Sequence, residues 1–427
     1  MKNLIIALSA TIIFALSAPA QNGDWIDSAA TRAADILVKT ATGIEMTGQF
    51  PRSLFTDYSL EQLQEQTGKA PTEFPVELIA HPSIEQYRQV RMCDYSDWTS
   101  GFFPGSLWYA YMLTGNKEAE AQAKRFTNML LPVSFMTDTH DLGFMINCSY
   151  GNAYLSAPDD SIKAVIVRTA DNLLSRYNQQ ISAIRSWDFG HWNYPVIIDN
   201  MMNLELLFNA SRFTGDNKYK DTAIKHADKT MKNHFRNDYT SYHVVSYNSD
   251  GSIESRGTFQ GHDDESAWSR GQGWALYGYA ECFRETGIKE FQDHAISIAD
   301  MIISRNKTDD LIPLWDFDAP DVSTTPRDAS AGAVIASGML DLAYQLGEKG
   351  KKYEDYAARM LKSLASSSYS APLDNPHGFV LEHSTGSLPH GSEIDTPLNY
   401  ADYYYLEALY RYKRMIKGLC PVETVMK

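Results

Sequence analysis

The stretch HWNYPVIIDNMMNLELLF, residues 191–208, contains an aspartate inside an otherwise apolar run. Asp199 follows three aliphatic residues, and on a helix it would share one face with Met202 and Leu206. Apolar surroundings disfavour the ionised form of a carboxylate, which suits it to donate a proton. The same pattern also allows two structural roles, because an aspartate shortly after Pro195 could cap a helix or pair with a buried cation.

A second carboxylate of similar character occurs earlier, in the motif HDLGF. Asp141 stands there between two stretches of helical pattern. If Asp141 and Asp199 face each other across one site, they interact, so that one carboxyl holds its proton more tightly and the other less tightly. Such a pair supplies the acid and the base that a hydrolase needs.

The segments around these aspartates are rich in tryptophan and in isolated polar groups. Indole faces suit the C–H faces of sugar rings, while arginine, histidine and glutamine suit carboxylates and hydroxyls. We therefore predict a carbohydrate cleft with the following candidate contacts: Trp98, Trp187, Trp192, His243, Gln260, Trp268, Arg270 and Trp274. Each tryptophan has an alternative role as a core residue, and Arg270 has one as a buried ion-pair partner of Asp263 or Asp264.

Neither a metal nor a nucleotide cofactor is predicted. The acidic motif GHDDES, residues 261–266, would need further ligands converging from elsewhere in the fold. The motif GQGWAL lacks the third glycine of a dinucleotide-binding loop, and no strand precedes it. The formal net charge of −15 argues against nucleic acid as a partner.

The N-terminus has the three parts of a secretory signal. A lysine precedes an apolar run over residues 4–16, and small residues follow it as far as Ala20. We expect residues 1–20 to be a signal peptide and the mature protein, 21–427, to be periplasmic or secreted. No later stretch is long and apolar enough to span a membrane. The four cysteines are widely separated, and free thiols are expected at all of them: Cys93, Cys148, Cys282 and Cys420.

A repeated pattern of two helices would position these residues. An apolar, aromatic helix, a short turn and an amphipathic helix recur at 106–130, 154–177, 204–231, 276–303 and 339–365. Gly115, Gly215 and Gly287 follow threonines at three of the turns and suit the left-handed conformation that ends a helix. The recurrence predicts an array of helical hairpins.

Long, dissimilar linkers between the hairpins favour a closed ring over an open solenoid. We predict an all-α fold, a single-domain (α/α)6 barrel of six helical hairpins, with the active-site loops gathered at one mouth. A pattern of alternating residues around Asp250-Gly251 also predicts a small β-hairpin inserted between helices.

Several motifs, taken together, resemble those of the unsaturated glucuronyl hydrolases of glycoside hydrolase family 88. They are, in order across residues 85–412, DWTSGFFPGSLW, HDLGFM, WNYPVIIDNMMNLELLF, DDESAWSRGQGWALYG and the segment from HSTG to NYADYYYLEAL. The resemblance implies an enzyme that removes the 4,5-unsaturated glucuronic acid from the non-reducing end of lyase-generated, glycosaminoglycan-type oligosaccharides. It implies that Asp141 and Asp199 are the essential aspartates, that the candidate contacts above bind the sugar, and that no cofactor is required.

The chemistry of such a substrate gives the two aspartates different tasks. Its C4=C5 double bond adjoins the ring oxygen, so a proton delivered to C4 leaves positive charge shared between C5 and that oxygen. Water then adds at C5, and the resulting hemiketal opens and expels the aglycone. We expect Asp199 to donate the proton and then activate the water, while Asp141 stays ionised and offsets the positive charge. His243 or Arg270 would bind the uronate carboxylate.

Two other functions are compatible with the same motifs. An unsaturated rhamnogalacturonyl hydrolase on this fold would act on pectin fragments, although HDLGF favours the glucuronyl substrate. A non-catalytic carbohydrate-binding barrel would keep the tryptophans but would have no reason to retain both carboxylates. The expected assembly is a monomer or a weak homo-oligomer.

Overall fold

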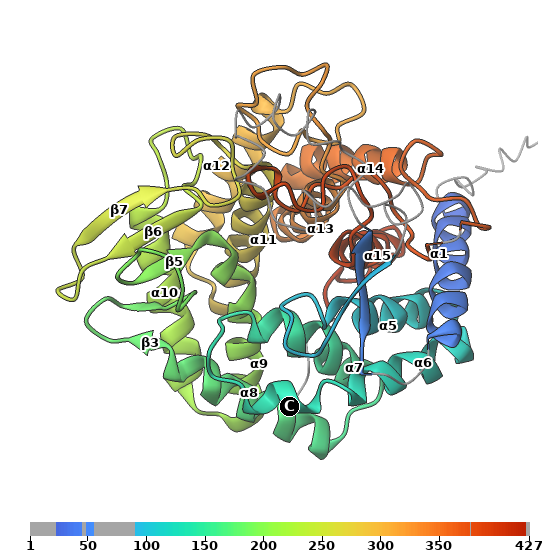
Figure 1. Ribbon diagram of the computed structural model, residues 1–427, viewed down its shortest axis with the longest axis horizontal. Coiled ribbons are helices and arrows are strands. Elements are labelled where there is room, and N and C mark those ends of the chain that lie inside the picture. Colours follow the sequence, from blue (N-terminus) through green and yellow to red (C-terminus); the bar gives the residue numbers. More distant parts are fainter. Residues whose placement is uncertain (1–22, 45–47, 55–89, 376, 424–427) are drawn as a thin grey trace, which may run out of the picture.

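Two concentric rings of helices form the core of the protein (Figure 1). The computed structural model describes residues 23–44, 48–54, 90–375 and 377–423, so the predicted signal peptide lies outside the described residues. The inner ring consists of α5 (Phe102–Thr114), the π-helix η3 (Gly143–Gly151) with α7 (Asn152–Ser156), α9 (Leu204–Thr214), α11 (Ser269–Thr286), α13 (Ala329–Leu346) and α15 (Asn399–Met415). The outer ring consists of α6 (Lys117–Asn128), α8 (Asp160–Ser175), α10 (Asn217–Asn233), α12 (Lys289–Arg305), α14 (Lys351–Leu364) and α1 (Asp24–Gly43).

Inner and outer helices differ in how much of their surface is apolar and buried. Helix α13 is mostly apolar and is buried around its whole circumference, since residues 329–343 are all buried. Helix α14 is amphipathic, with Tyr353, Tyr356 and Met360 on its buried face and its lysines exposed. An inner helix is covered on every side and an outer helix on one side only, so these patterns decide which ring each helix joins.

The glycine turns of the hairpins have the predicted conformation. Gly115, Gly215 and Gly287 have φ angles of 74°, 73° and 70°, and the N–H of each donates to the carbonyl four residues earlier. Residues with a Cβ are strained at such positive φ angles, which is why glycine ends these inner helices.

The sixth hairpin joins the two ends of the described chain. Helix α15 closes the inner ring between α13 and α5, and α1 packs outside it against α5, α6 and α15. Only five hairpins are visible as repeats in the sequence, because the sixth pairs α1 with α15, which lie at opposite ends of the described chain. The predicted (α/α)6 barrel is therefore confirmed, with the ring closed by tertiary contact.

Three small antiparallel sheets accompany the helices. Their strands are β1 (Phe50–Leu54) with β2 (Val90–Cys93), β3 (Tyr177–Asn178) with β4 (Ala183–Ile184), and β5 (Pro195–Ile197) with β6 (Val244–Tyr247) and β7 (Ile253–Gly257). The hairpin predicted around Asp250-Gly251 is confirmed as β6 and β7. Short 3-10 helices occur at η2 (Leu131–Phe135), η4 (Ile198–Asn203), η5 (Gly347–Gly350) and η6 (Leu388–His390).

Asp199 does not lie on the α-helical face that it would share with Met202 and Leu206. Residues 195–197 form strand β5, which pairs with β6, and the chain then passes through η4 before α9 begins at Leu204. Two successive β-branched residues after a proline favour the extended backbone, and the edge of the β6–β7 hairpin offers them a partner. Asp199 therefore lies one residue past the start of a 3-10 helix.

Two further predictions concern the cysteines and the membrane. All four cysteines are free, with Cys93, Cys148 and Cys282 buried and Cys420 half-buried, as expected. Over the described ranges, no helix has the length and hydropathy needed to cross a bilayer.

Candidate active site

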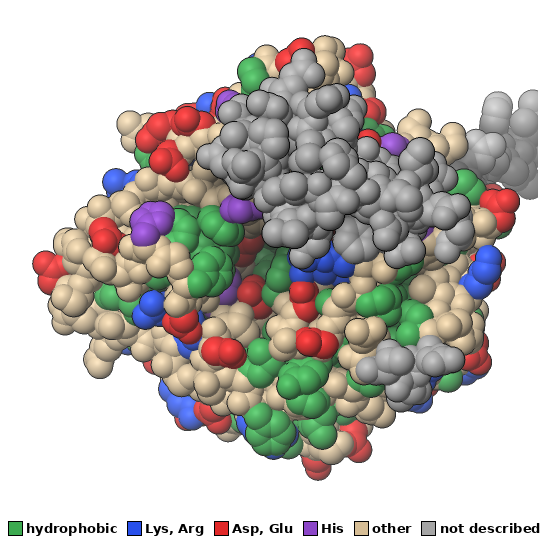
Figure 2. All heavy atoms as spheres, viewed as in Figure 1, with side chains coloured by type: hydrophobic (Ala, Val, Ile, Leu, Met, Phe, Trp, Pro, Cys, Tyr) green, Lys and Arg blue, Asp and Glu red, His purple; other side chains and the backbone are tan. Residues whose placement is uncertain are grey.

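A cleft of about 510 Å³ opens at the N-terminal ends of four inner-ring elements. Its volume falls in the range of a site for a small ligand. Figure 2 shows hydrophobic, acidic and histidine side chains gathered around a hollow on this face. The cleft is lined by Trp98, Asp138, Thr139, His140, Asp141, Ser186, Trp187, Asp188, Phe189, Ile197, Asp199, Phe259 and Gln260.

Asp199 lies in the wall of this cleft and is 7% exposed. Its side chain caps no helix, since neither η4 nor α9 has a side-chain cap. Its buried Oδ2 atom has no hydrogen-bond partner in the described part of the chain and stands 3.5 Å from Nε2 of His243. The capping interpretation is therefore excluded, and the carboxylate is available to a ligand.

The β5–β6 pairing brings His243 to Asp199. Ile197 pairs with Val244, and the N–H of Ile198 donates to the carbonyl of His243 over 3.0 Å. On the other side of the imidazole, Nδ1 accepts the N–H groups of residues 259 and 260, each over 3.1 Å. Because Nδ1 is an acceptor, the ring proton of His243 must be on Nε2, facing Asp199.

Asp141 lies just before the π-helix η3 and faces the same cleft. Thr139 Oγ1 donates to its Oδ2 atom over 3.0 Å, and Nε2 of His140 stands 3.3 Å from Oδ1. Burial raises the pKa of Asp141, His140 and Thr139 act in the opposite direction, and the nearby charge of Asp199 raises it further. The two carboxylates thus interact, as expected for a catalytic pair.

A close contact between η3 and η4 holds the two aspartates in one cleft. A Cβ atom on Gly143 would lie 2.6 Å from Cα of Asn203, so only glycine permits this approach. Asn203 Oδ1 also accepts the N–H of Phe144 over 3.0 Å. Both helices are irregular where they meet, and π- and 3-10 geometry at such a position often marks a functional site.

An aromatic wall, defined here as Trp187, Phe189, Trp192 and Phe259, stands at one side of the cleft. Trp187, Phe189 and Phe259 line the cavity, whereas Trp192 packs against Trp187 and Phe259 without lining it. Trp187 stacks on Phe189 at 5.0 Å and 22°, and it contacts Phe259 at 5.0 Å and Trp192 at 5.5 Å. Phe189 is 54% exposed. The two phenylalanines were not predicted, because tryptophan was the only aromatic residue type considered for sugar contacts, although Phe189 follows Trp187 closely in the same segment.

The structure brings Trp98 and Gln260 to the cleft as well. Trp98 packs against Phe144 at 5.6 Å and Tyr400 at 5.1 Å, and it lines the cavity. Gln260 lines the cavity too, and its Nε2 atom donates to the carbonyl of Gly386 over 3.2 Å.

Arg270 does not line the cleft surface. Its buried guanidinium forms an ion pair with Asp328 and donates to the carbonyls of Thr385 over 2.7 Å and Gly386 over 2.6 Å. Its partner is thus neither Asp263 nor Asp264. Burial alone would lower the pKa of Arg270, but the surrounding negative groups raise it instead.

Trp268 and Trp274 also lie behind the cleft wall. Trp268 is sandwiched between the guanidinium of Arg270 at 4.5 Å and the ring of His243 at 4.6 Å, so it supports the histidine. Trp274 is 0% exposed and packs in the barrel core against Phe144 and Tyr404. The structure therefore assigns these residues, with Arg270, to supporting the cleft from behind.

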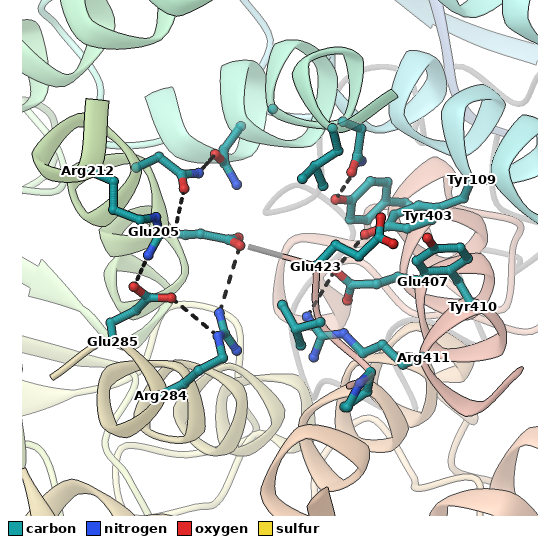
Figure 3. Close-up of a pocket in the computed structure, with 17 residues that line it drawn as sticks. Tyr109, Glu205, Arg212, Arg284, Glu285, Tyr403, Glu407, Tyr410, Arg411 and Glu423 are labelled. Atoms are coloured by element: carbon teal, nitrogen blue, oxygen red, sulfur yellow. Dashed lines mark hydrogen bonds and ion pairs between the residues drawn. The ribbon is translucent and has the colours of Figure 1, made fainter. Parts of the chain in front are cut away.

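A second, enclosed cavity of about 40 Å³ lies on α9, α11 and α15, away from the cleft residues. Figure 3 shows Arg212 and Arg284 converging on Glu285, with Arg284 also directed toward Glu205 at 4.0 Å. Its arginines are thus taken up by neighbouring carboxylates, and we assign it no catalytic role. Among the described residues, no three His, Cys, Asp or Glu side chains are grouped so that they could hold a metal ion.

Comparison with known proteins identifies the family. The sequence profile of Glycosyl Hydrolase Family 88 matches residues 76–419. The chain belongs to this family. It is 42% identical over 349 residues to an unsaturated glucuronyl hydrolase of Formosa agariphila, covering 80% of this chain and 85% of that one. Over 337 residues it is 32% identical to an unsaturated glucuronyl hydrolase of Bacillus sp. strain GL1, covering 76% and 88%.

Solved structures of the family have the same fold. A crystal structure of an unsaturated glucuronyl hydrolase specific for heparin superposes with a TM-score of 0.83 at 46% identity, covering 94% of this chain and 100% of that chain. The enzyme of Bacillus sp. GL1 superposes with a TM-score of 0.80 at 28% identity, covering 92% and 97%. The prediction of a family 88 glycosidase of the unsaturated glucuronyl hydrolase type is confirmed.

Proposed function

We propose that this family 88 hydrolase removes 4,5-unsaturated glucuronate from the non-reducing end of glycosaminoglycan fragments, and that heparin-type fragments are its best substrates. The observation that carries the chemistry is the pair Asp141 and Asp199, which line one cleft, with Asp199 buried and the Asp141 side chain 14% exposed, and which each face the Nε2 atom of a histidine. The heparin preference is supported by 46% identity to a heparin-specific enzyme whose whole chain is covered.

In the proposed reaction, Asp199 delivers a proton to C4 of the vinyl ether. Its Oδ2 atom is buried and makes no hydrogen bond within the described residues, so the reacting carbon meets no competing partner. The positive charge that develops on C5 and the ring oxygen is offset by ionised Asp141. Asp199, now ionised, removes a proton from the water that attacks C5, and the hemiketal then opens and expels the aglycone.

Binding of the sugar is assigned to the groups that line the cleft. The aromatic wall and Trp98 provide apolar faces for the sugar rings. Because the guanidinium of Arg270 is already bound and the imidazole of His243 is buried against Asp199, we assign the uronate carboxylate to the Gln260 amide, which lines the cleft and has a second N–H besides the one that it donates to Gly386.

The decisive experiment incubates the purified protein with lyase-generated disaccharides from heparin, chondroitin, hyaluronan and pectin. Hydrolysis destroys the conjugated double bond, so loss of its ultraviolet absorbance measures the rate. We expect loss with glycosaminoglycan disaccharides, fastest with heparin. Activity restricted to pectin disaccharides would identify a rhamnogalacturonyl hydrolase, and binding without any loss of absorbance would identify a carbohydrate-binding barrel.

We also propose that the enzyme is exported as a monomer or weak homo-oligomer after removal of residues 1–20. The charged, apolar and small-residue segments of the N-terminus support this. Intact-mass analysis of protein from the periplasm or culture medium should give a chain beginning near Gln21. Light scattering should give the mass of one chain at low concentration, and a stable larger assembly would contradict the proposal.

A further inference from the structure

His140 is a buried cleft residue to which the mechanism above gives no task. It is 0% exposed, lines the cleft and immediately precedes Asp141. Its Nε2 atom stands 3.3 Å from Oδ1 of Asp141. Within the described residues, neither ring nitrogen of His140 makes a hydrogen bond. A fully buried imidazole with so few partners is costly unless a neighbouring charge compensates it.

The carboxylate–histidine pair at Asp199 differs from this one in a decisive way. Nδ1 of His243 accepts two backbone N–H groups, so a second proton on that ring would be directed against both of them. His243 is thereby fixed as a neutral donor. Nδ1 of His140 has no such donor in the described part of the chain, so no backbone N–H group opposes a proton on that nitrogen.

We propose that His140 is a positioning residue that, as an imidazolium, keeps Asp141 ionised, while the fixed neutrality of His243 leaves the proton of the carboxylate pair on Asp199. The second nitrogen of each histidine thus decides which aspartate is the acid and which is the stabilising anion. This inference rests on the proposed function for its catalytic consequence, although the charge states can be measured without turnover.

The surroundings of Asp141 are consistent with that role. The groups that face it are His140, Thr139, Asp199 and Asp97. Burial and the two aspartates raise the pKa of Asp141, so the positive charge of His140 is the main influence that favours its ionised form. His226 also faces His140, and burial lowers the pKa of His226 to about 3, so it adds no competing positive charge.

The first test is the pH profile of kcat/KM for His140→Gln. Glutamine can still donate a hydrogen bond to Asp141 but cannot carry a charge. We expect the acid limb of the profile to move upward by about one pH unit, because Asp141 then becomes protonated more readily. An acid limb at the wild-type position would overturn the proposal.

His294→Gln is the matched control for loss of a buried imidazole. His294 is buried against Phe235 and Tyr279, does not line the cleft and has an Nε2 atom without a hydrogen bond among the described residues. Its replacement should lower the thermal midpoint without moving the acid limb. An equal shift in both variants would show that the effect of His140 is only structural.

The second test needs no substrate. Ring-nitrogen NMR of the full-length enzyme labelled at histidine nitrogens gives the protonation of each imidazole, with signals assigned from His140→Gln and His243→Gln. We expect His140 to carry protons on both nitrogens at the pH of maximal activity, and His243 to carry one, on Nε2. A neutral His140 ring would overturn the proposal even in an active enzyme. An inactive wild-type enzyme with the expected ring states would instead contradict the proposed function alone.

Discussion

The two carboxylates of the cleft each face Nε2 of a histidine, but the two pairs are built in different ways. His140 and Asp141 are neighbours in sequence, in the linker before η3, and their contact is local. His243 lies just before β6 and Asp199 lies in η4, far apart in the chain, and the β5–β6 ladder brings them together.

The rest of the fold thus restricts the tautomer of His243 and does not restrict that of His140 in the same way. Two backbone N–H groups from residues 259 and 260 fix the tautomer of His243. No described donor does the same for Nδ1 of His140. On our proposal, these two chemically similar pairs perform opposite tasks, one as an acid and one as a permanent anion.

Replacing Asp199, the proposed acid, is expected to have the largest effect on turnover. Asp199→Asn removes the proton that C4 must receive, so we expect kcat to fall by about 100- to 10,000-fold. Disaccharide affinity should change little, because the amide keeps the shape of the side chain. Stopped absorbance assays give kcat, and titration calorimetry gives the affinity. A variant with near wild-type turnover would remove Asp199 from the chemistry.

Replacing the anion is expected to cost somewhat less. Asp141→Asn removes the negative charge that offsets the developing cation, and we expect kcat to fall by about 100- to 1,000-fold. Since burial raises the pKa of Asp141, wild-type activity should fall at a higher pH than an ordinary carboxyl would cause. The residual activity of the variant should not show that acid limb. If the limb persists, another group is responsible for it.

Replacing His243 tests the His243–Asp199 pair without changing His140 or Asp141. His243→Asn leaves the N–H groups of residues 259 and 260 without their acceptor and Asp199 without its facing donor. We expect kcat to fall by about 100-fold through misplacement of the acid. His294→Gln, which does not line the cleft, is the control that changes a buried histidine without touching Asp199.

The last effect is expected in stability at mildly acidic pH and not in turnover. Burial lowers the pKa of His226 to about 3 and that of His234 to about 4, from an ordinary value of 6.5. Both support the Asp199 side of the cleft, through Ile184 and Val196 respectively. Below pH 6.5 the unfolded chain binds protons that the folded chain refuses, so stability is complete above that pH and falls as the pH drops toward 4.

For each such histidine the loss is about 1.4 kcal/mol per pH unit. Thermal midpoints measured between pH 7 and 4.5 should fall with decreasing pH, and His234→Gln should fall less steeply than the wild type. Glutamine can keep the donor to the Val196 carbonyl but has no ring to protonate. Equal slopes would mean that His234 is not kept neutral by the fold.

The hairpin repeat and most of the cleft could be predicted because they depend on local pattern. Helix α14 shows its buried face in its own sequence, and Gly115 marks its turn by the conformation that only glycine adopts readily. The apolar run around Asp199 likewise predicted a buried carboxylate. Strand β5 was not predicted, because its partner strand, β6, lies in a segment distant in sequence.

The amino-acid sequence by itself determined the helical hairpins, the family, and the presence of two aspartates in apolar surroundings, since these depend on periodicity and residue type. Only the tertiary structure decided that Arg270 is bound by Asp328 behind the cleft, that Phe189 joins the aromatic wall, and that Asp141 and Asp199 each face a histidine. Ion pairs, ring contacts and histidine tautomers depend on contacts between residues that are distant in sequence. The packing of η3 against η4 and the pairing of β5 with β6 determine these contacts in the cleft.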